Sequence, residues 1–360
     1  MATLQDKISN LEDSQLEVVE TCPICGSDSS TFLWVNYDRL YHLPGKFPTV
    51  MCDGCSLVRI SPRPNVDAIS LYYPESYGAY TSEFSIRTVA ASNKLGFRNA
   101  VRASVLYGLG YKTNELSFWQ KALSPIFTKF FYKQATYGYG DRFPKFVKDG
   151  NALEVGCGNG SYLSYLKHHG WNVQGLDLSE HAAKQARDLF DIDVRVGQLE
   201  NVTFDPDSFD YIHLSHVVEH FYDPMAALRM VFRLLKPGGT VYIEVPNAEG
   251  AGANISGSYW YGWDAPRHLF TFNIKNLRLA IENASLSVIQ MNTFLWNSFA
   301  WAETYENEFL SGEMLQNRPS EESEISQNNW TKAKARFRDD PFAGDIISCW
   351  ATKPLTEEKN

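Results

Sequence analysis

The run Leu-Glu-Val-Gly-Cys-Gly-Asn-Gly at residues 153–160 decides the fold of this chain. Its apolar start is typical of a strand end, and its glycines form a turn that lets the backbone approach a ligand closely. A following helix would present free N–H groups at the same place. Gly156, Gly158 and Gly160 follow G-x-G-x-G, but Ser161 stands where a dinucleotide fingerprint has its third Gly or Ala. The run therefore predicts a nucleotide-cofactor site and disfavours NAD as the ligand.

Further strand-like runs follow at the rhythm of βα units. One ends at Asp177, where a carboxylate can accept both ribose hydroxyls of a nucleotide. Another leads into Gln198, and a third ends at Ser215. The alternative is that the glycines only make a turn and Asp177 only caps a helix. That alternative must explain four strand-end features that occur in order: the glycine-rich run, Asp177, Gln198 and the stretch 215–220. The strand-like runs of this paragraph, with the next one along the chain, are 172–178, 191–197, 209–215 and 240–245.

Strands that alternate with helical stretches predict a parallel sheet with helices on both faces and ligands beyond the carboxyl ends of the strands. Residues 285–294 and 345–353 alternate as strands, and we expect them to supply antiparallel sixth and seventh strands. Residues 303–340 are polar and acidic, which predicts a surface insertion that is part helical and part disordered. The predicted fold class is α/β.

The glycine-rich run resembles motif I of the class I S-adenosylmethionine-dependent methyltransferases, and Asp177 occupies the place of that family's ribose-binding acid. The resemblance implies a Rossmann-like methyltransferase sheet of seven strands, the last antiparallel. It implies S-adenosylmethionine as cofactor and methyl transfer as activity. The cofactor-binding residues that it implies are Glu154, Gly156, Gly158, Gly160, Asp177, Leu178, Gln198, Leu199 and Ser215.

Composition sets outer limits on the class of protein. The 360 residues are 44% apolar, with a formal net charge of −9. No run approaches the ~18 apolar residues of a membrane span, and residues 1–20 lack the basic and apolar regions of a secretory signal. We therefore expect a cytoplasmic protein without a membrane span. The sequence gives no indication of an oligomeric state.

The segment 63–150 is basic although the chain is acidic, with twelve Lys or Arg against six Asp or Glu. Aromatic residues alternate with these cations at roughly helical spacing. This pattern predicts amphipathic helices with solvated lysines. A second interpretation is a helical cap over the cofactor crevice that attracts an anionic acceptor, such as a nucleotide-sugar diphosphate or a lipid headgroup.

Four of the six cysteines form two C-x-x-C pairs, Cys22 with Cys25 and Cys52 with Cys55. Two such pairs a few tens of residues apart predict a tetrahedral site for structural Zn²⁺, because four thiolates satisfy the ion and the cytosol keeps thiols reduced. A redox C-x-x-C is the rival, but no thioredoxin-like βαβ pattern surrounds either pair.

The cysteine pairs and the following Pro- and Tyr-rich stretch resemble the zinc-ribbon subgroup of class I methyltransferases, which includes sugar C-methyltransferases and proteins of surface-polysaccharide synthesis. Within that subgroup, Tyr72, Tyr73 and Tyr77 could form a lid over the substrate, or simply pack between ribbon and core. The predicted segments are a zinc ribbon at 1–62, a helical cap or linker at 63–145, a cofactor-binding core at 146–302, an insertion at 303–340 and a final strand and tail at 341–360.

Candidate catalytic residues follow the fourth strand: His216, Glu219 and His220. A histidine placed beside the methyl group could remove the acceptor's proton. His216-x-x-Glu219-His220 also matches the H-x-x-E-H pattern of inverted zinc proteases. We reject this match because that motif must lie within a helix, whereas here it starts at a strand tip. His216 could instead pack beneath the cofactor, and His220 could be structural.

A second cluster follows the fifth strand. His268 is a further candidate base, while Tyr261, Trp263 and Arg267 are candidate substrate-binding residues. Arg267 suits a phosphate or carboxylate of the acceptor, or a structural pair with Asp264. Sugar C-methyltransferases usually carry a different, doubly His-containing segment here, so the sequence favours O-methylation.

The predicted function is methylation of a small molecule, most specifically O-methylation of a sugar, nucleotide sugar or glycan. C-methylation of a keto-sugar nucleotide stays open. So do an RNA methyltransferase and a non-catalytic cofactor-binding protein. The acidic ribbon argues against nucleic acid as a partner, because affinity for phosphate backbones comes from clustered Lys and Arg.

Overall fold

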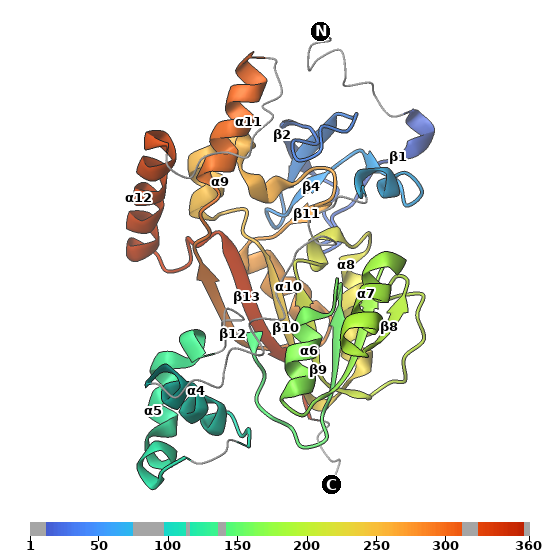
Figure 1. The fold of residues 1–360 in the computed structure, drawn as a ribbon. Coiled ribbons are helices and arrows are strands. Elements are labelled where there is room, and N and C mark those ends of the chain that lie inside the picture. Colours follow the sequence, from blue (N-terminus) through green and yellow to red (C-terminus); the bar gives the residue numbers. More distant parts are fainter. Residues whose placement is uncertain (1–11, 75–96, 113–115, 136–141, 312–322, 356–360) are drawn as a thin grey trace. The chain divides into compact units, whose positions relative to one another are not determined.

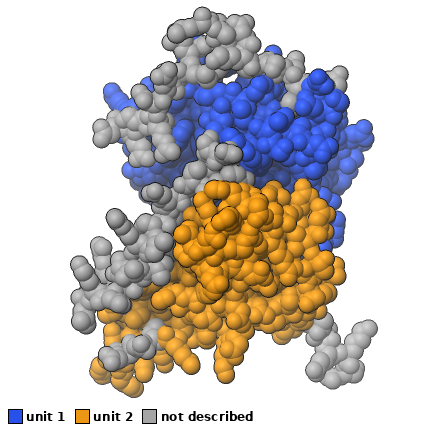
Figure 2. Space-filling view, turned by 45° about the vertical axis from the view of Figure 1, so that its right-hand side comes forward, with its two compact units in different colours: residues 1–75, 215–232, 243–352 blue, residues 76–214, 233–242, 353–360 orange. Residues whose placement is uncertain are grey.

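The computed structural model describes residues 12–74, 97–112, 116–135, 142–311 and 323–355. The chain forms two compact units, coloured separately in Figure 2. Unit 1 comprises residues 1–75, 215–232 and 243–352, and unit 2 comprises residues 76–214, 233–242 and 353–360. Each unit combines stretches that are distant in sequence, so neither coincides with one of the predicted segments. The predicted segment boundaries remain a proposal.

The largest sheet has seven strands in the order β12-β13-β10-β9-β6-β7-β8 (Figure 1). β6 pairs in parallel with β7 and β9, β7 pairs in parallel with β8, and β12 pairs antiparallel with β13. This order confirms the predicted α/β sheet and its antiparallel end. The strands are β6 Asn151–Val155, β7 Asn172–Asp177, β8 Asp193–Val196, β9 Phe209–Ser215, β10 Leu235–Pro246, β12 Ser287–Phe294 and β13 Ile346–Thr352.

In unit 2, helices α6 (Ser161–His168) and α7 (Glu180–Phe190) each follow a parallel strand. Their inner faces are apolar: Leu163 and Leu166 of α6 are fully buried. Burying each such leucine contributes about 1.5–3 kcal/mol. The Ser179 side chain caps α7 by accepting the N–H of Ala182 at 3.2 Å.

The fifth strand differs from its predicted extent. The predicted run covers 240–245, but β10 starts at Leu235, directly after α8 (Pro224–Leu234). Strand pairing explains the extended backbone. The Gly238 N–H donates to the Lys353 carbonyl at 2.8 Å, and the Lys353 N–H donates to the Gly239 carbonyl at 3.0 Å.

The described part of the basic segment forms helices α4 (Phe97–Gly108) and α5 (Phe118–Ala135). The helices pack closely, since a side chain at Gly108 would bring its Cβ to 2.1 Å from Thr128 Oγ1. Among the described residues, no helix is both long and apolar enough to cross a membrane.

In unit 1, the segment that carries the paired cysteines supplies three strands of a four-stranded sheet of order β11-β4-β3-β2. The fourth strand, β11 at one edge, comes from a stretch about 200 residues further along the chain, which local sequence patterns did not predict. Phe270 and Thr271 of β11 pair antiparallel with Arg59 and Val58 of β4. The strands are β2 Ser30–Asn36, β3 Phe47–Cys52, β4 Val58–Ile60 and β11 Phe270–Thr271, with a separate pair β1 Leu16–Glu17 and β5 Arg63–Pro64.

The described parts of the predicted insertion are largely helical. The insertion contributes most of α11 (Phe299–Ser311) and all of α12 (Glu324–Asp339). The two helices share a small core in which Phe299 and Ala333 are buried with Ala251. The remaining helices of the described chain are α9 Ala251–Ser256 and α10 Ile274–Asn283, with the 3₁₀ turns η1 Asp13–Gln15, η2 Ile69–Tyr72, η5 Val218–His220, η6 Gly257–Tyr259 and η7 Tyr261–Trp263.

Candidate functional site

The glycine-rich turn in unit 2 has the backbone that its sequence predicts. Gly156, Gly158 and Gly160 have φ of 70°, 52° and 77°, in the left-handed region that glycine tolerates best. A Cβ at Gly160 would lie 2.7 Å from the Cβ of Ala186. The turn therefore requires glycine for both its backbone conformation and its packing against α7.

Asp177 ends β7 beside this turn and is mostly buried. One carboxylate oxygen accepts the Gly158 N–H at 2.8 Å, and the other accepts the Ser179 N–H at 2.8 Å. Burial raises the pKa of Asp177, although these backbone donors oppose the shift. Each oxygen keeps a further lone pair, so Asp177 can support the turn and still accept a hydroxyl.

Glu154 lies on β6 in a buried polar pair with His213 of β9, their Oε1 and Nδ1 atoms 3.0 Å apart. Burial raises the pKa of Glu154 well above its usual range. Its other oxygen, Oε2, is buried without a hydrogen-bond partner in the described part of the chain. Such an orphaned oxygen fits a site that a polar ligand completes. His213 was missed because nothing in its strand marks it as polar-facing.

The other predicted cofactor residues of unit 2 follow the neighbouring strand ends. Leu178 is 61% exposed beside the buried Asp177, while Leu199 is buried. Gln198 is exposed, and its Oε1 accepts from Asn201 at 3.4 Å. An exposed leucine next to a buried carboxylate suits an apolar contact with a nucleoside.

In unit 1, His216 lies between two buried carboxylates. Its Nδ1 is 3.2 Å from Glu219 Oε1, and its Nε2 is 3.2 Å from Glu244 Oε1. Burial favours the neutral ring, but the two carboxylates outweigh it and raise the pKa of His216 to about 10. Both ring nitrogens are then donors, so His216 has no nitrogen left to accept a substrate proton. Ser215 Oγ donates to the same Glu244 at 3.4 Å.

Glu244 was missed because an acid inside a buried strand carries no motif. His216 itself has a φ of 55°, uncommon for a residue other than glycine. This backbone ends β9 abruptly and keeps His216 out of a helix, so the inverted-protease motif is absent.

His220 and His268 lie next to Glu219, with their ring centroids 4.7 Å apart. We call His216, Glu219, His220 and His268 the histidine cluster. His220 Nδ1 lies 2.9 Å from the Arg267 carbonyl oxygen, and His268 Nδ1 lies 2.8 Å from the Gly262 carbonyl oxygen. Because a carbonyl only accepts, each Nδ1 carries a proton. Burial, helped by His268, lowers the pKa of His220 to about 4. The His220 ring is therefore neutral near pH 7, with its lone pair on Nε2.

Arg267 is fully buried, and all five of its N–H groups have partners. Nη2 donates to Asp38 Oδ1 at 2.8 Å and to Asp264 Oδ1 at 2.6 Å, while Nε donates to Asp264. Nη1 donates to Asp38 Oδ2 and to the Tyr72 carbonyl. This saturation favours the structural alternative over the predicted contact with an acceptor phosphate.

The predicted tyrosine lid divides into different environments. Tyr72 is buried and its hydroxyl donates to the Pro44 carbonyl, which fits the packing alternative. Tyr73 is half-buried, with its hydroxyl 3.1 Å from His220 Nδ1. Tyr77 lies outside the described residues. Tyr73 is thus the described tyrosine of this group that reaches the histidine cluster.

The aromatic candidates after β10 also pack within unit 1. Trp263 is buried, and its Nε1 donates to the Gly257 carbonyl at 2.8 Å. Tyr261 packs edge-on against Trp296, with ring centroids 4.9 Å apart. Trp263 is therefore part of the packed interior, whereas Tyr261 is half-buried and stays a candidate for contact with substrate.

The four cysteines of unit 1 offer their sulfurs within 4.8 Å of one another. Cys22 and Cys55 sulfurs are 3.6 Å apart, and Cys25 and Cys52 sulfurs are 3.5 Å apart. These separations exceed a disulfide bond of ~2.05 Å. They suit a tetrahedral ion with metal–sulfur bonds of ~2.3 Å. Burial raises the pKa of Cys52, but backbone N–H donors from Cys55 and Gly54 outweigh it, giving about 7.

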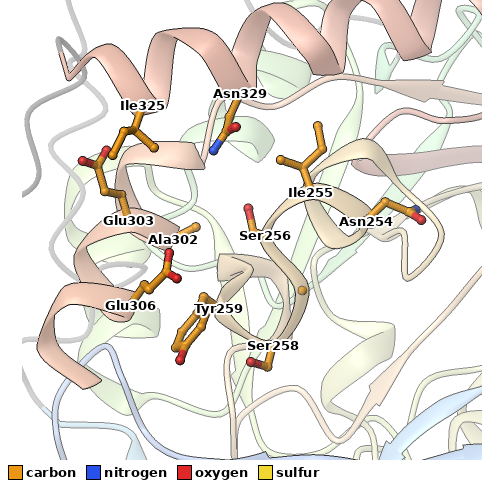
Figure 3. A pocket seen from close by; sticks show the side chains of 11 residues that line it. Asn254, Ile255, Ser256, Ser258, Tyr259, Ala302, Glu303, Glu306, Ile325 and Asn329 are labelled. Atoms are coloured by element: carbon orange, nitrogen blue, oxygen red, sulfur yellow. The ribbon is translucent and has the colours of Figure 1, made fainter. Parts of the chain in front are cut away.

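A pocket of about 370 Å³ lies within unit 1 between the α9–η6 turn and helices α11 and α12 (Figure 3). Its polar lining includes Glu303, Glu306 and Asn329. None of the predicted site residues lines it. We therefore assign it no part in the chemistry.

The comparisons with known proteins agree with these features. Residues 132–291 match a family model described as a methyltransferase domain. The chain is 35% identical over 101 residues to a ubiquinone biosynthesis O-methyltransferase of Xanthomonas campestris, covering 26% of this chain and 42% of the relative. It is 30% identical over 156 residues to the Xanthomonas oryzae protein of the same name, covering 40% and 65%.

The chain thus spans between two fifths and two thirds of these curated relatives. A solved S-adenosylmethionine-dependent methyltransferase from Mesorhizobium loti matches with a TM-score of 0.41 at 16% identity, covering 59% of this chain and 94% of that one. A TM-score this low carries no functional weight. Residues 132–291 are thus similar to a methyltransferase domain, and they contain the left-handed glycine turn and the parallel strands β6, β7, β8 and β9.

Proposed function

We propose that the whole protein is an S-adenosylmethionine-dependent methyltransferase that methylates a hydroxyl group of a small molecule. The observation that carries this proposal is the contact between the Asp177 carboxylate and the Gly158 N–H at 2.8 Å. This contact joins the acid that we propose to bind ribose to the glycine turn. The orphaned oxygen of Glu154 would add a polar group for the ligand. When bound, the cofactor supplies an electrophilic methyl group.

The residues after β9 support oxygen as the methylated atom. A hydroxyl must lose its proton as the methyl arrives, and His220 offers a neutral Nε2 for it, with His268 as second candidate. A base with a pKa of about 4 is weak near neutral pH. We therefore assign removal of the acceptor's hydroxyl proton to the pair of histidines rather than to His220 alone. The names of the curated relatives, which are O-methyltransferases, support the same atom.

The acceptor proposed from the sequence is a sugar, nucleotide sugar or glycan. The relatives' names favour a second candidate, a hydroxyl of a ubiquinone precursor. With Arg267 saturated, no described arginine of the histidine cluster is available for an acceptor phosphate, which favours an uncharged hydroxyl compound. C-methylation, action on RNA and a purely binding role remain alternatives.

In unit 1, the four cysteine sulfurs are proposed to hold one structural Zn²⁺. A closed shell of four thiolates leaves no open position for substrate, so the ion would stabilise the ribbon and take no part in methyl transfer.

Transfer of a radiolabelled methyl group from S-adenosylmethionine tests the function. The acceptor panel contains nucleotide sugars, glycans, catechol-type ubiquinone precursors and RNA. We expect label in one hydroxyl-bearing class, lost in Asp177→Ala. Label on RNA, or none on any class by a protein that binds the cofactor, would contradict the proposal.

A further inference from the structure

Three side chains of the histidine cluster meet in an arrangement that methyl transfer does not require. Glu219, His220 and His268 each offer one ligand atom, and these atoms lie within 4.8 Å of one another. Two imidazoles and a carboxylate make a common ligand set for divalent transition metals. Ligand atoms on one such ion lie about 3–4 Å apart, given bonds of about 2.0–2.2 Å. Small side-chain movements would therefore close the trio around an ion.

Glu219 supplies the observation that a hydrogen-bonded cluster alone would not. Its side chain is fully buried, and its Oε1 is occupied by His216 at 3.2 Å. Its Oε2 is buried without a partner among the described residues. A buried carboxylate oxygen without a donor is costly, whereas a bound cation would satisfy it.

The two histidines are already oriented as metal-ligating histidines are. Each gives its Nδ1 proton to a backbone carbonyl, His220 to Arg267 and His268 to Gly262. This hydrogen bond fixes ring and tautomer and leaves Nε2 for the ion. His268 Nε2 lies 3.9 Å from Glu219 Oε1.

The surroundings of the cluster are also rich in carboxylates. Asp38, Glu219 and Glu244 are buried, and Asp264 is mostly buried, in or next to the cluster. Arg267 is paired with Asp38 and Asp264, and His216 lies between Glu219 and Glu244. Carboxylates outnumber these basic side chains, which suits a cation.

We propose that Glu219, His220 and His268 bind a divalent transition-metal ion, whose remaining positions are open to water or to an oxygen of the acceptor. His216 is not a ligand, because both of its nitrogens are held by carboxylates. This site is separate from the four-cysteine ribbon and does not depend on methyl transfer. In the protein without the ion, the two Nε2 atoms stay free for an acceptor proton; with the ion bound, the same histidines would act on an acceptor hydroxyl through the metal.

Manganese is the probe, because Mn²⁺ prefers oxygen and nitrogen ligands and leaves the ribbon thiolates to zinc. Full-length protein with its zinc in place is titrated with Mn²⁺, and the free ion is counted by electron paramagnetic resonance. We expect one Mn²⁺ per chain, with affinity at least tenfold weaker in Glu219→Gln and in His268→Gln. In a second measurement, one further equivalent of Zn²⁺ is added in place of Mn²⁺, and elemental analysis counts the zinc bound per chain.

The matched control is His169→Gln, a half-buried histidine of unit 2, which should bind Mn²⁺ as the wild type does. Circular dichroism and retained ribbon zinc show that each variant is folded. Because two ligand positions are substituted, the proposal can still be tested with one variant if the other does not fold. Absence of both an Mn²⁺ site and a second Zn²⁺ site, or wild-type binding by folded Glu219→Gln and His268→Gln, would overturn the proposal.

Discussion

The Asp177 carboxylate accepts the backbone N–H of Gly158 at 2.8 Å, so the acid at the end of β7 also supports the glycine turn that follows β6. The same contact joins two parts of the proposed cofactor site. The Gly156 N–H donates to the Leu176 carbonyl at 2.7 Å, and the Gly197 N–H donates to the Asp177 carbonyl at 2.9 Å. The ends of β6, β7 and β8 are thereby held together as a unit.

Asp177→Ala is predicted to weaken S-adenosylmethionine binding at least tenfold. The variant loses the ribose contacts, at roughly 1.5–3 kcal/mol for each hydrogen bond to a charged group, and it frees the Gly158 and Ser179 N–H groups. Titration calorimetry measures the change. The control is Ser179→Ala, which loses only the helix cap of α7 and should keep its affinity. Equal affinity in folded Asp177→Ala and wild type would refute the assignment.

His220→Ala is predicted to slow methyl transfer by about two to four decades while cofactor affinity stays within a few-fold. His220→Gln should not recover the rate, because an amide cannot take up a proton. Single-turnover rates with the acceptor found by the screen provide the measurement. His268→Ala tests the second histidine in the same way. If both alanine variants retain full activity, neither ring removes the acceptor's proton.

One Zn²⁺ per chain is predicted, bound by Cys22, Cys25, Cys52 and Cys55. Cys25→Ser should lose the ion and lower the melting temperature, because the four sulfurs join two segments that lie 27 to 33 positions apart in the sequence. Elemental analysis and thermal unfolding measure both effects. The matched control is Cys349→Ser, a buried cysteine of β13 outside the cluster. Less than half an equivalent of zinc in wild-type protein would count against the site.

Arg267→Met is predicted to destabilise the fold by about 3–5 kcal/mol, because it leaves the buried carboxylates of Asp38 and Asp264 without their cation. Denaturant unfolding measures the change. Arg278→Met removes an exposed i,i+4 pair with Glu282 and should cost less than about 0.5 kcal/mol. If the two variants are equally stable, the ion pairs of Arg267 with Asp38 and Asp264 do not stabilise the fold.

The sequence predicted the sheet and the glycine turn because their signals are local. An apolar run, a glycine spacing and an acid at a strand end all lie within a few residues of each other. It could not predict the partners of Arg267, since Asp38 lies 229 positions away and carries no motif. The addition of β11 to the ribbon sheet was hidden for the same reason. Glu244 and His213 were missed because a polar residue in a buried strand looks like an exception until its partner is known.

His169 gives the fold of unit 2 a predicted dependence on pH. Its ring is packed among Tyr111, Phe143 and Tyr165, and its Nδ1 lies 2.8 Å from the Tyr165 carbonyl oxygen. Burial lowers the pKa of His169 from 6.5 to about 4, outweighing the hydrogen bond, which favours the charged ring. The unfolded chain therefore takes up a proton below pH 6.5, whereas the folded chain does so only near pH 4.

The contribution of His169 to stability is therefore fully present above pH 6.5 and is lost as the pH falls to 4, by at most about 2–3 kcal/mol. His169→Gln keeps a donor for the Tyr165 carbonyl but cannot titrate. Its free energy of unfolding should fall less steeply than that of the wild type between pH 6.5 and 4, measured by urea unfolding at each pH. His168→Gln, which removes the exposed neighbouring imidazole, should keep the wild-type slope. Parallel curves for His169→Gln and wild type would show that the His169 ring takes up its proton equally in both states.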